Sequence, residues 1–118
     1  EIKKAGKLLG KKGRLIILCP AHNYLYTEFD KNVGHHRRYN KKMFIKIKPN
    51  KMFIEKLFYL DSFGFFLSLF NKLFLNRNPK NEEIKIWDRY FVPVSIFLDT
   101  ILNYTFGKSI ICIYRKEI

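Results

Sequence analysis

One loop of the chain holds most of the residues that could do chemistry. Between Ala21 and Tyr39 it is dense in groups that can bind anions or move protons, and the candidate site residues are His22, Tyr26, Asp30, His35, Arg37, Arg38 and Tyr39. A histidine titrates near neutral pH and can act as a base. Paired arginines suit a carboxylate or a phosphate on a substrate. The residue types therefore favour a loop that positions a substrate, although they do not single out a catalytic residue.

The same loop also allows a purely structural interpretation. Either Arg37 or Arg38 could pair with Asp30 to hold the loop in place. Tyr39 could pack beneath the loop, and His22 could satisfy a nearby backbone group. Because adjacent side chains leave the backbone in different directions, one arginine should face Asp30 and the other the substrate pocket. No carboxylate or cysteine stands at ligand spacing from the histidines, so the sequence predicts no metal site.

The element that positions this loop is a short apolar run. Arg14–Cys19 lies between Gly13 and Pro20, a pattern that predicts a buried strand. Polar loops at the carboxyl ends of such strands bind ligands in open α/β sheets. A helical turn is expected within the loop around Tyr24 to Asp30.

Helices and strands alternate along the rest of the chain. We expect helices at residues 1–9, at Lys41–Lys48 after an Asn40 cap, at Phe63–Leu75 after Asp61-Ser62, and at Glu82–Tyr104 with a kink or break at Pro93; a loop at Asn76–Asn81; and strands at Lys51–Leu60 and Lys108–Arg115. This alternation is typical of an α/β sheet. Three strands are few for such a sheet, and Glu1 opens directly on an amphipathic helix without a capping residue. We therefore expect the chain to begin inside an element, with the missing part supplying further strands.

Composition limits the classes of function. The formal net charge of +13 suggests nucleic acid, an anionic membrane surface or an anionic substrate as partner. A lysine-rich composition without function explains the charge equally well. Nucleic acid is the weaker choice, because the aromatic residues lie in apolar runs and not among the basic residues. Cys19 and Cys112 both lie in apolar strands, so we expect reduced and protected thiols.

The motifs around the loop resemble those of a known family. Class I S-adenosylmethionine-dependent methyltransferases of the type-11/23-like group often have a Leu-Lys-Pro-Gly-Gly turn, a buried strand, Pro-Ala, Leu-Tyr, an Asp and Gly-His-x-Arg-Arg-Tyr. This chain has Leu9-Gly10-Lys11-Lys12-Gly13, Arg14–Cys19, Pro20-Ala21, Leu25-Tyr26, Asp30, Gly34-His35-His36-Arg37-Arg38-Tyr39 and, before the last strand, Phe106-Gly107-Lys108-Ser109. It departs from the pattern where Lys11-Lys12 replaces Pro-Gly and where Pro49 shortens the following helix.

The resemblance implies a Rossmann-like sheet of seven strands with the last antiparallel. The three strands here would be the fifth, sixth and seventh, with the seventh inserted between the other two. Residues 1–118 would be the C-terminal part of a single methyltransferase domain in a cytoplasmic enzyme. The S-adenosylmethionine site would lie upstream, since no Gly-x-Gly-x-x-Gly occurs in this chain. The methyl acceptor would be a small molecule or a lipid-linked group, and the fragment alone would be inactive.

The aromatic segment Phe63–Leu75 has two interpretations. It could be core or a lid over the substrate pocket. It could instead lie in a membrane interface, with Lys72 and Arg77 near lipid phosphates. At 13 residues it is too short to span a bilayer, which takes about 20. The main rival to the enzyme is therefore a non-catalytic basic module that binds a membrane surface or a protein partner through its aromatic helices.

Overall fold

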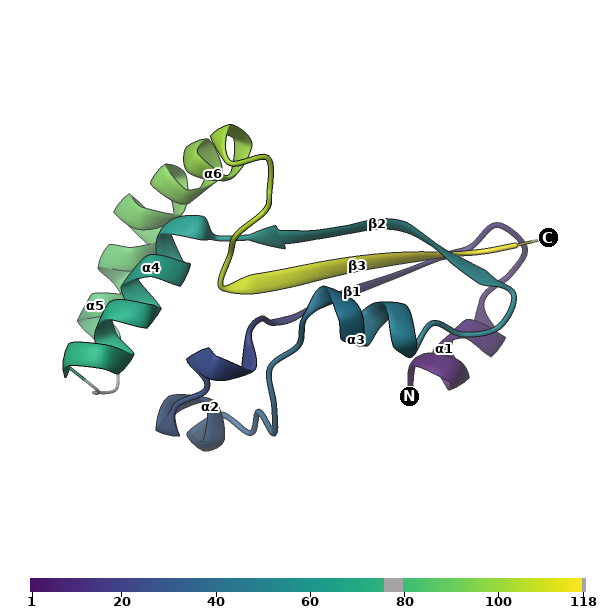
Figure 1. The fold of residues 1–118 in the computed structure, drawn as a ribbon, viewed down its shortest axis with the longest axis horizontal. Helices are drawn as coiled ribbons and strands as arrows, with labels where there is room; N and C mark the ends of the chain where they lie inside the picture. Colours follow the sequence, from purple (N-terminus) through teal and green to yellow (C-terminus); the bar gives the residue numbers. More distant parts are fainter. Residues whose placement is uncertain (76–79, 118) are drawn as a thin grey trace.

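The computed structural model describes residues 1–75 and 80–117 and shows a mixed α/β fold (Figure 1). A three-stranded antiparallel sheet carries short helices on one face, and a helical arm extends from one end. The elements are α1 (Ile2–Leu8), β1 (Arg14–Pro20), α2 (Glu28–Asn32), α3 (Lys41–Lys46), β2 (Met52–Leu60), α4 (Ser62–Phe70), α5 (Asn81–Ile86), α6 (Val92–Ile101) and β3 (Ser109–Lys116). A 3₁₀ turn lies at Asn23–Leu25, and π-helical segments lie at Asn71–Leu75 and Trp87–Phe91.

The last strand of the chain is the central strand of the sheet. The strand order is β1-β3-β2, and β3 is antiparallel to both neighbours. At the middle of the sheet, Cys112 pairs with Ile17 of β1 and with Leu57 of β2. The two outer strands therefore run in the same direction without touching each other. This is the strand order that the methyltransferase resemblance predicts.

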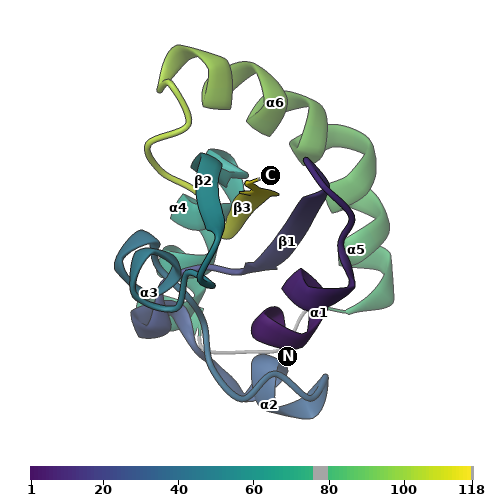
Figure 2. The same cartoon turned by 90° about the vertical axis from the view of Figure 1, so that its right-hand side faces the viewer.

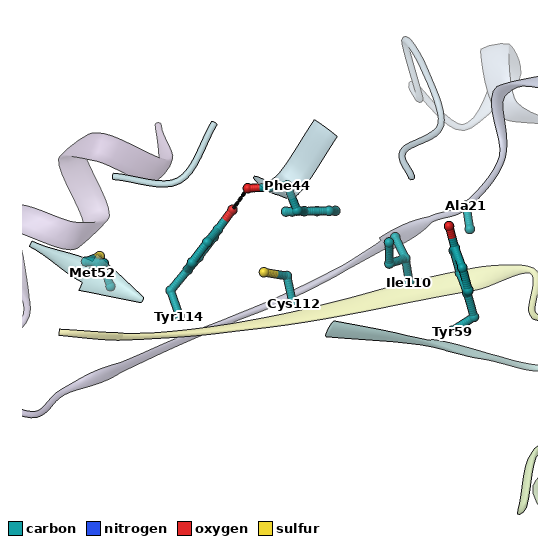
Figure 3. Packing of buried hydrophobic residues seen from close by; sticks show 7 residues of the cluster. All are labelled: Ala21, Phe44, Met52, Tyr59, Ile110, Cys112 and Tyr114. Carbon is teal, nitrogen blue, oxygen red and sulfur yellow. Dashed lines mark hydrogen bonds between the residues drawn. The ribbon is translucent and has the colours of Figure 1, made fainter. Parts of the chain in front are cut away.

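The core lies on one face of the sheet. Alternate residues of a strand point to the same side, and Ile110, Cys112 and Tyr114 of β3 all point toward α3 (Figure 3). There they meet Phe44, whose carbonyl accepts a hydrogen bond of 2.6 Å from the Tyr114 hydroxyl. The side chain of Lys116 donates to carbonyls in α1 and just after it, which attaches that helix to the same face.

The opposite face of the sheet is open. Ile16 and Leu18 of β1 lie on it, and each is 64% exposed. Within residues 1–75 and 80–117, the outer edge of β1 pairs with no strand. Apolar strands with a free edge are normally paired or covered, because exposed edges promote aggregation.

The helical arm consists of two helices that pack side by side. One is α4 with its continuation to Leu75, and the other runs through α5, Trp87–Phe91 and α6. The rings of Phe63 and Phe91 meet between them at 5.2 Å. Seen end-on in Figure 2, α1 and α3 lie on one side of the strands and α6 on the other. In Figure 1 the arm lies at one end of the sheet, and Ile16 and Leu18 on the open face stay exposed.

Buried polar contacts join the arm to the sheet. The carboxylate of Asp99 on α6 accepts hydrogen bonds of 2.8 Å from the backbone amides of Asp61 and Ser62, at the start of α4. Ser95 donates to the Asp61 carboxylate from the same side. Nearby, Gly107 lies so close to the backbone of β2 that a Cβ atom there would stand 2.0 Å from the carbonyl oxygen of Leu60. A larger residue than glycine does not fit at this position.

Several predicted boundaries are wrong. The first strand includes Pro20, which has no N–H to donate but whose carbonyl accepts from the Tyr39 amide. Helix α3 ends at Lys46, two residues early. The long helix continues past Pro93 without a break, with a π-helical segment just before it, but ends at Ile101 because Asn103 and Tyr104 adopt left-handed backbone angles. Most of the predicted Asn76–Asn81 loop lies outside the described residues, and its last residue, Asn81, is the first residue of α5.

Candidate functional site

The candidate loop leaves β1 at its carboxyl end and returns to the same point. The amide of His22 donates to the carbonyl of Tyr39, and the amide of Tyr39 donates to that of Pro20, both at 2.9 Å. These bonds form a parallel bridge between Ala21 and Tyr39. The base of the loop is therefore an extension of the sheet, and only the residues between the two ends are free to serve another purpose.

A buried ion pair holds the middle of the loop. Arg38 donates from Nε and Nη2 to the two oxygens of Asp30, each at 3.0 Å, and from Nη1 to the carbonyl of Ala21 at 3.2 Å. Asp30 is 1% exposed and Arg38 5%. The Asp30 carboxylate also accepts the Thr27 amide at 3.0 Å, which caps α2. Arg38 is thus the arginine that faces Asp30.

The electrostatics of this pair follow from its contacts. Burial alone would raise the pKa of the Asp30 carboxyl. The hydrogen bonds from Arg38 and Thr27 outweigh burial and hold that pKa below its ordinary value. Both charges are therefore retained at neutral pH and satisfy each other. A pair so enclosed fixes the loop and does not present a charge to a ligand.

Arg37, His35 and His36 lie on the outside of the loop. All three are exposed. The Arg37 side chain forms no hydrogen bond or ion pair with the described part of the chain. His35 places Nδ1 3.5 Å from Asp30 Oδ1, and its carbonyl accepts the Tyr26 hydroxyl at 2.7 Å. Tyr26 therefore helps to hold the loop, whereas the neighbouring cationic and imidazole groups can reach an anion from outside.

His22 lies in an aromatic cluster beneath the loop. Its ring stacks on Tyr59 at 4.6 Å and on Tyr24 at 5.0 Å, and Phe65 meets it edge-on at 5.4 Å. Its Nε2 is buried without a hydrogen-bond partner among the described residues. Burial and then the charge of Arg38 lower the pKa of His22, against a hydrogen bond with the Gly107 backbone. His22 is therefore neutral at pH 7.

This environment predicts a pH-dependent stability. The native state disfavours the His22 proton, whereas the unfolded chain binds it with a pKa near 6.5. Below that pH the unfolded state holds more protons, so the free energy of unfolding should fall as the pH drops. Urea melts from pH 8 to 5 should show the loss, and His22→Phe, which keeps the ring stack, should show less of it. Parallel pH curves for the two proteins would contradict this assignment.

Tyr39 lies on the core face of the sheet, beside a shallow groove. Its ring packs against Phe44 at 5.7 Å. The groove is bounded by α1, α3 and β1, and Cys19 lines it together with Tyr39. Cys19 is only half-buried, whereas Cys112 is fully buried. Burial raises the pKa of both thiols. Both thiols are free, as expected, but only Cys112 is fully enclosed.

The two cysteines should react with thiol reagents at different rates. Cys19 is reachable from the groove, whereas Cys112 becomes accessible only when the sheet opens, because it is central in the core. We expect one fast and one slow phase with a neutral disulfide reagent at pH 8. Cys19→Ser should remove the fast phase and leave the slow one. Two equal rates in the parent protein would contradict the packing around Cys112.

Two residues outside the candidate set, Lys108 and Asp99, also form contacts at this end of the molecule. Lys108 places Nζ 5.1 Å from the ring centre of Trp87, and burial lowers the pKa of its ammonium group despite the nearby Asp61 carboxylate. The Phe106–Ser109 motif was a signal for Lys108. Asp99 had a weaker signal, as a single acid in the apolar run of α6. Their contacts join α6 and the last loop to the carboxyl ends of β1 and β2.

Comparison with known proteins finds no match. No protein-family model matches the chain, and no curated protein or solved structure matches it significantly. Within the described ranges, no three His, Cys, Asp or Glu residues are grouped to hold a metal ion. No helix there has the length and apolar content needed to cross a membrane.

Proposed function

We propose that the chain is the C-terminal part of a class I S-adenosylmethionine-dependent methyltransferase and carries its substrate-side loop. The observation that carries this proposal is the strand order. An antiparallel last strand lies between two strands that run the same way, and the Gly34–Tyr39 motif sits at the carboxyl end of one of them. The order and the motif come from separate parts of the chain, and the methyltransferase family combines both.

The free edge of β1 supports the same proposal. Ile16 and Leu18 are apolar and exposed beside that edge, as expected for a strand that pairs with further strands in the complete protein. The residues present do not form an S-adenosylmethionine site, since the glycine-rich loop and the acidic ribose partner are both expected upstream. The chain itself contributes the acceptor side of the reaction.

Some residues of the loop hold its shape, and others are placed to contact a substrate. Arg38, Asp30 and Tyr26 hold its shape by the bonds described above. Arg37 and His35 are exposed on this rigid base, where they would orient an anionic group on the methyl acceptor. Fixed placement of the acceptor is the main requirement of an in-line methyl transfer. We therefore assign Arg37 and His35 to substrate binding, for a small-molecule or lipid-linked acceptor.

The test begins with the coding sequence upstream of Glu1. An acidic residue followed by x-Gly-x-Gly should lie roughly 80–100 residues before Glu1, because a βαβ cofactor unit needs 30 residues or more. The protein that includes this segment should bind S-adenosylmethionine in titration calorimetry, and the 118-residue chain should not. Micromolar binding by the short chain, or an upstream frame without the segment, would contradict the proposal.

The alternative function is a non-catalytic basic module. The exposed apolar side chains of the arm favour it, because an isolated enzyme core would not need them. The same titration separates the two proposals. A module predicts no cofactor binding by any length of the protein, whereas the methyltransferase predicts binding by the longer one.

A further inference from the structure

The helical arm, residues 62–75 and 80–101, exposes a row of apolar side chains on each of its two helices. Along α4 and its continuation, Phe66, Phe70, Leu73 and Phe74 are each more than half exposed. Phe66, Phe70 and Phe74 recur every four residues and Leu73 is three residues from Phe70, spacings that make side chains neighbours on a helix surface. The rings of Phe70 and Phe74 touch at 4.9 Å and make this row continuous.

The second helix carries a similar row. Ile86, Tyr90, Val94, Phe97 and Ile101 are spaced three or four residues apart, and each is at least 40% exposed. The two helices pack against each other through other residues. Phe63 and Phe91 meet between the helices, and Asp99 faces the start of α4. The exposed rows are therefore not the packing surface of the arm.

Charge is divided unevenly between the arm and the rest of the chain. Of the 23 basic and 10 acidic residues, the described arm holds four of each, which leaves 19 and six elsewhere. The arm is nearly neutral and rich in apolar rings, so its insertion among lipid tails carries little desolvation penalty. The remainder is strongly cationic and would be attracted to anionic headgroups.

We infer that the arm lies in the surface of an anionic lipid bilayer, with its phenylalanines among the outer acyl chains. The arm extends past the end of the sheet, so it can reach a flat surface without hindrance from the rest of the molecule (Figure 1). No described helix is both long and apolar enough to cross a membrane, and interfacial helices bind by apolar burial assisted by basic residues. This inference does not depend on the proposed methyl transfer.

A second copy of the chain is a less suitable occupant of the same surface. Two molecules that each carry a net charge of +13 repel one another on approach. An anionic bilayer reverses the sign of that interaction and offers an apolar layer of the required depth. The charge of the chain therefore selects between two surfaces that its apolar residues alone would fit equally.

Trp87 provides an internal probe for the test, because it is the only tryptophan and lies in the arm. Vesicles of phosphatidylcholine with phosphatidylglycerol should shift its fluorescence to the blue. Lipids brominated on the acyl chain should quench it. Vesicles of phosphatidylcholine alone should bind the chain much more weakly. No shift and no quenching at a saturating concentration of anionic vesicles would overturn the inference.

Matched variants distinguish vesicle binding by the arm from non-specific binding by exposed apolar residues. Phe70→Ser and Phe97→Ser should each weaken vesicle binding by about tenfold, the effect of removing one buried phenyl group. Leu8→Ser is the control, because Leu8 is 89% exposed on α1, outside the arm. If a variant fails to fold by circular dichroism, Phe74→Ser or Ile101→Ser replaces it. Equal losses for Leu8 and the arm variants, or a dimer without lipid that Phe97→Ser abolishes, would overturn the inference.

Discussion

Replacing Arg38 with alanine should lower the free energy of unfolding by about 3–5 kcal/mol, whereas the same change at Arg37 should leave it nearly unchanged. Arg38 is 5% exposed and makes three hydrogen bonds inside the loop, two of them to Asp30. Its removal leaves the buried Asp30 carboxylate with the Thr27 amide and hydroxyl and, at 3.5 Å, His35 Nδ1 as its remaining partners. Arg37 is exposed and loses no contact within the described residues when it is shortened.

Urea melts at pH 7 on both variants measure this difference. Asp30→Asn combined with Arg38→Ala is the internal control, because it removes the stranded charge and should recover part of the loss. In the longer protein, Arg37→Ala should instead weaken binding of an anionic methyl acceptor. If the two alanine variants melt at the same urea concentration, the buried pair does not hold the loop.

Replacing Asp99 with alanine should have the second largest effect, about 2–4 kcal/mol. Its two oxygens accept the amides of Asp61 and Ser62, and no solvent reaches Ser62 to replace them. The change therefore leaves two amides unpaired at the start of α4. It also removes the main polar link between α6 and the end of β2, so the arm should loosen before the sheet does.

Hydrogen exchange tests that order directly. The Ser62 amide should exchange faster in Asp99→Ala, while the amides of β3 keep most of their protection. In Asp99→Asn the Ser62 amide should exchange at a rate between those of the parent protein and Asp99→Ala, because asparagine retains one acceptor oxygen. Asp88→Ala removes an exposed acid from the same arm and should change nothing. A uniform rise in exchange across arm and sheet would mean that Asp99 supports the whole fold and not the arm.

Local signals were sufficient for the strands and for part of the loop. Apolar runs bounded by glycine and proline placed β1, β2 and β3 within a few residues. The choice between Arg37 and Arg38 depended on the direction of Asp30. Thr27 and Asp30 stand three residues apart, which is a helix-capping spacing. That spacing predicts the bond from the Thr27 amide to the Asp30 carboxylate, whereas the choice of Arg38 as partner depends on how the loop folds back.

The remaining features depend on residues that are distant in the sequence. Asp99 caps α4 from 37 residues away, and nothing near Asp99 marks it as a cap. The end of α6 is determined by Tyr104, whose carbonyl accepts the Tyr59 amide of β2 at 3.1 Å. A tertiary bond of this kind overrides the helical pattern of the local sequence, so the predicted helix ran three residues too far.

The position of β3 also determines the order in which the molecule can fold. Both sheet interfaces belong to Ser109–Lys116, so β1 and β2 have no partner among the described strands until that segment has left the ribosome. While the residues between them and β3 are being made, β1 and β2 therefore lack this partner. A stop codon shortly after Tyr104 would remove only the last strand, but it would abolish both strand pairings of the described sheet and leave β2 exposed to chaperones and proteases.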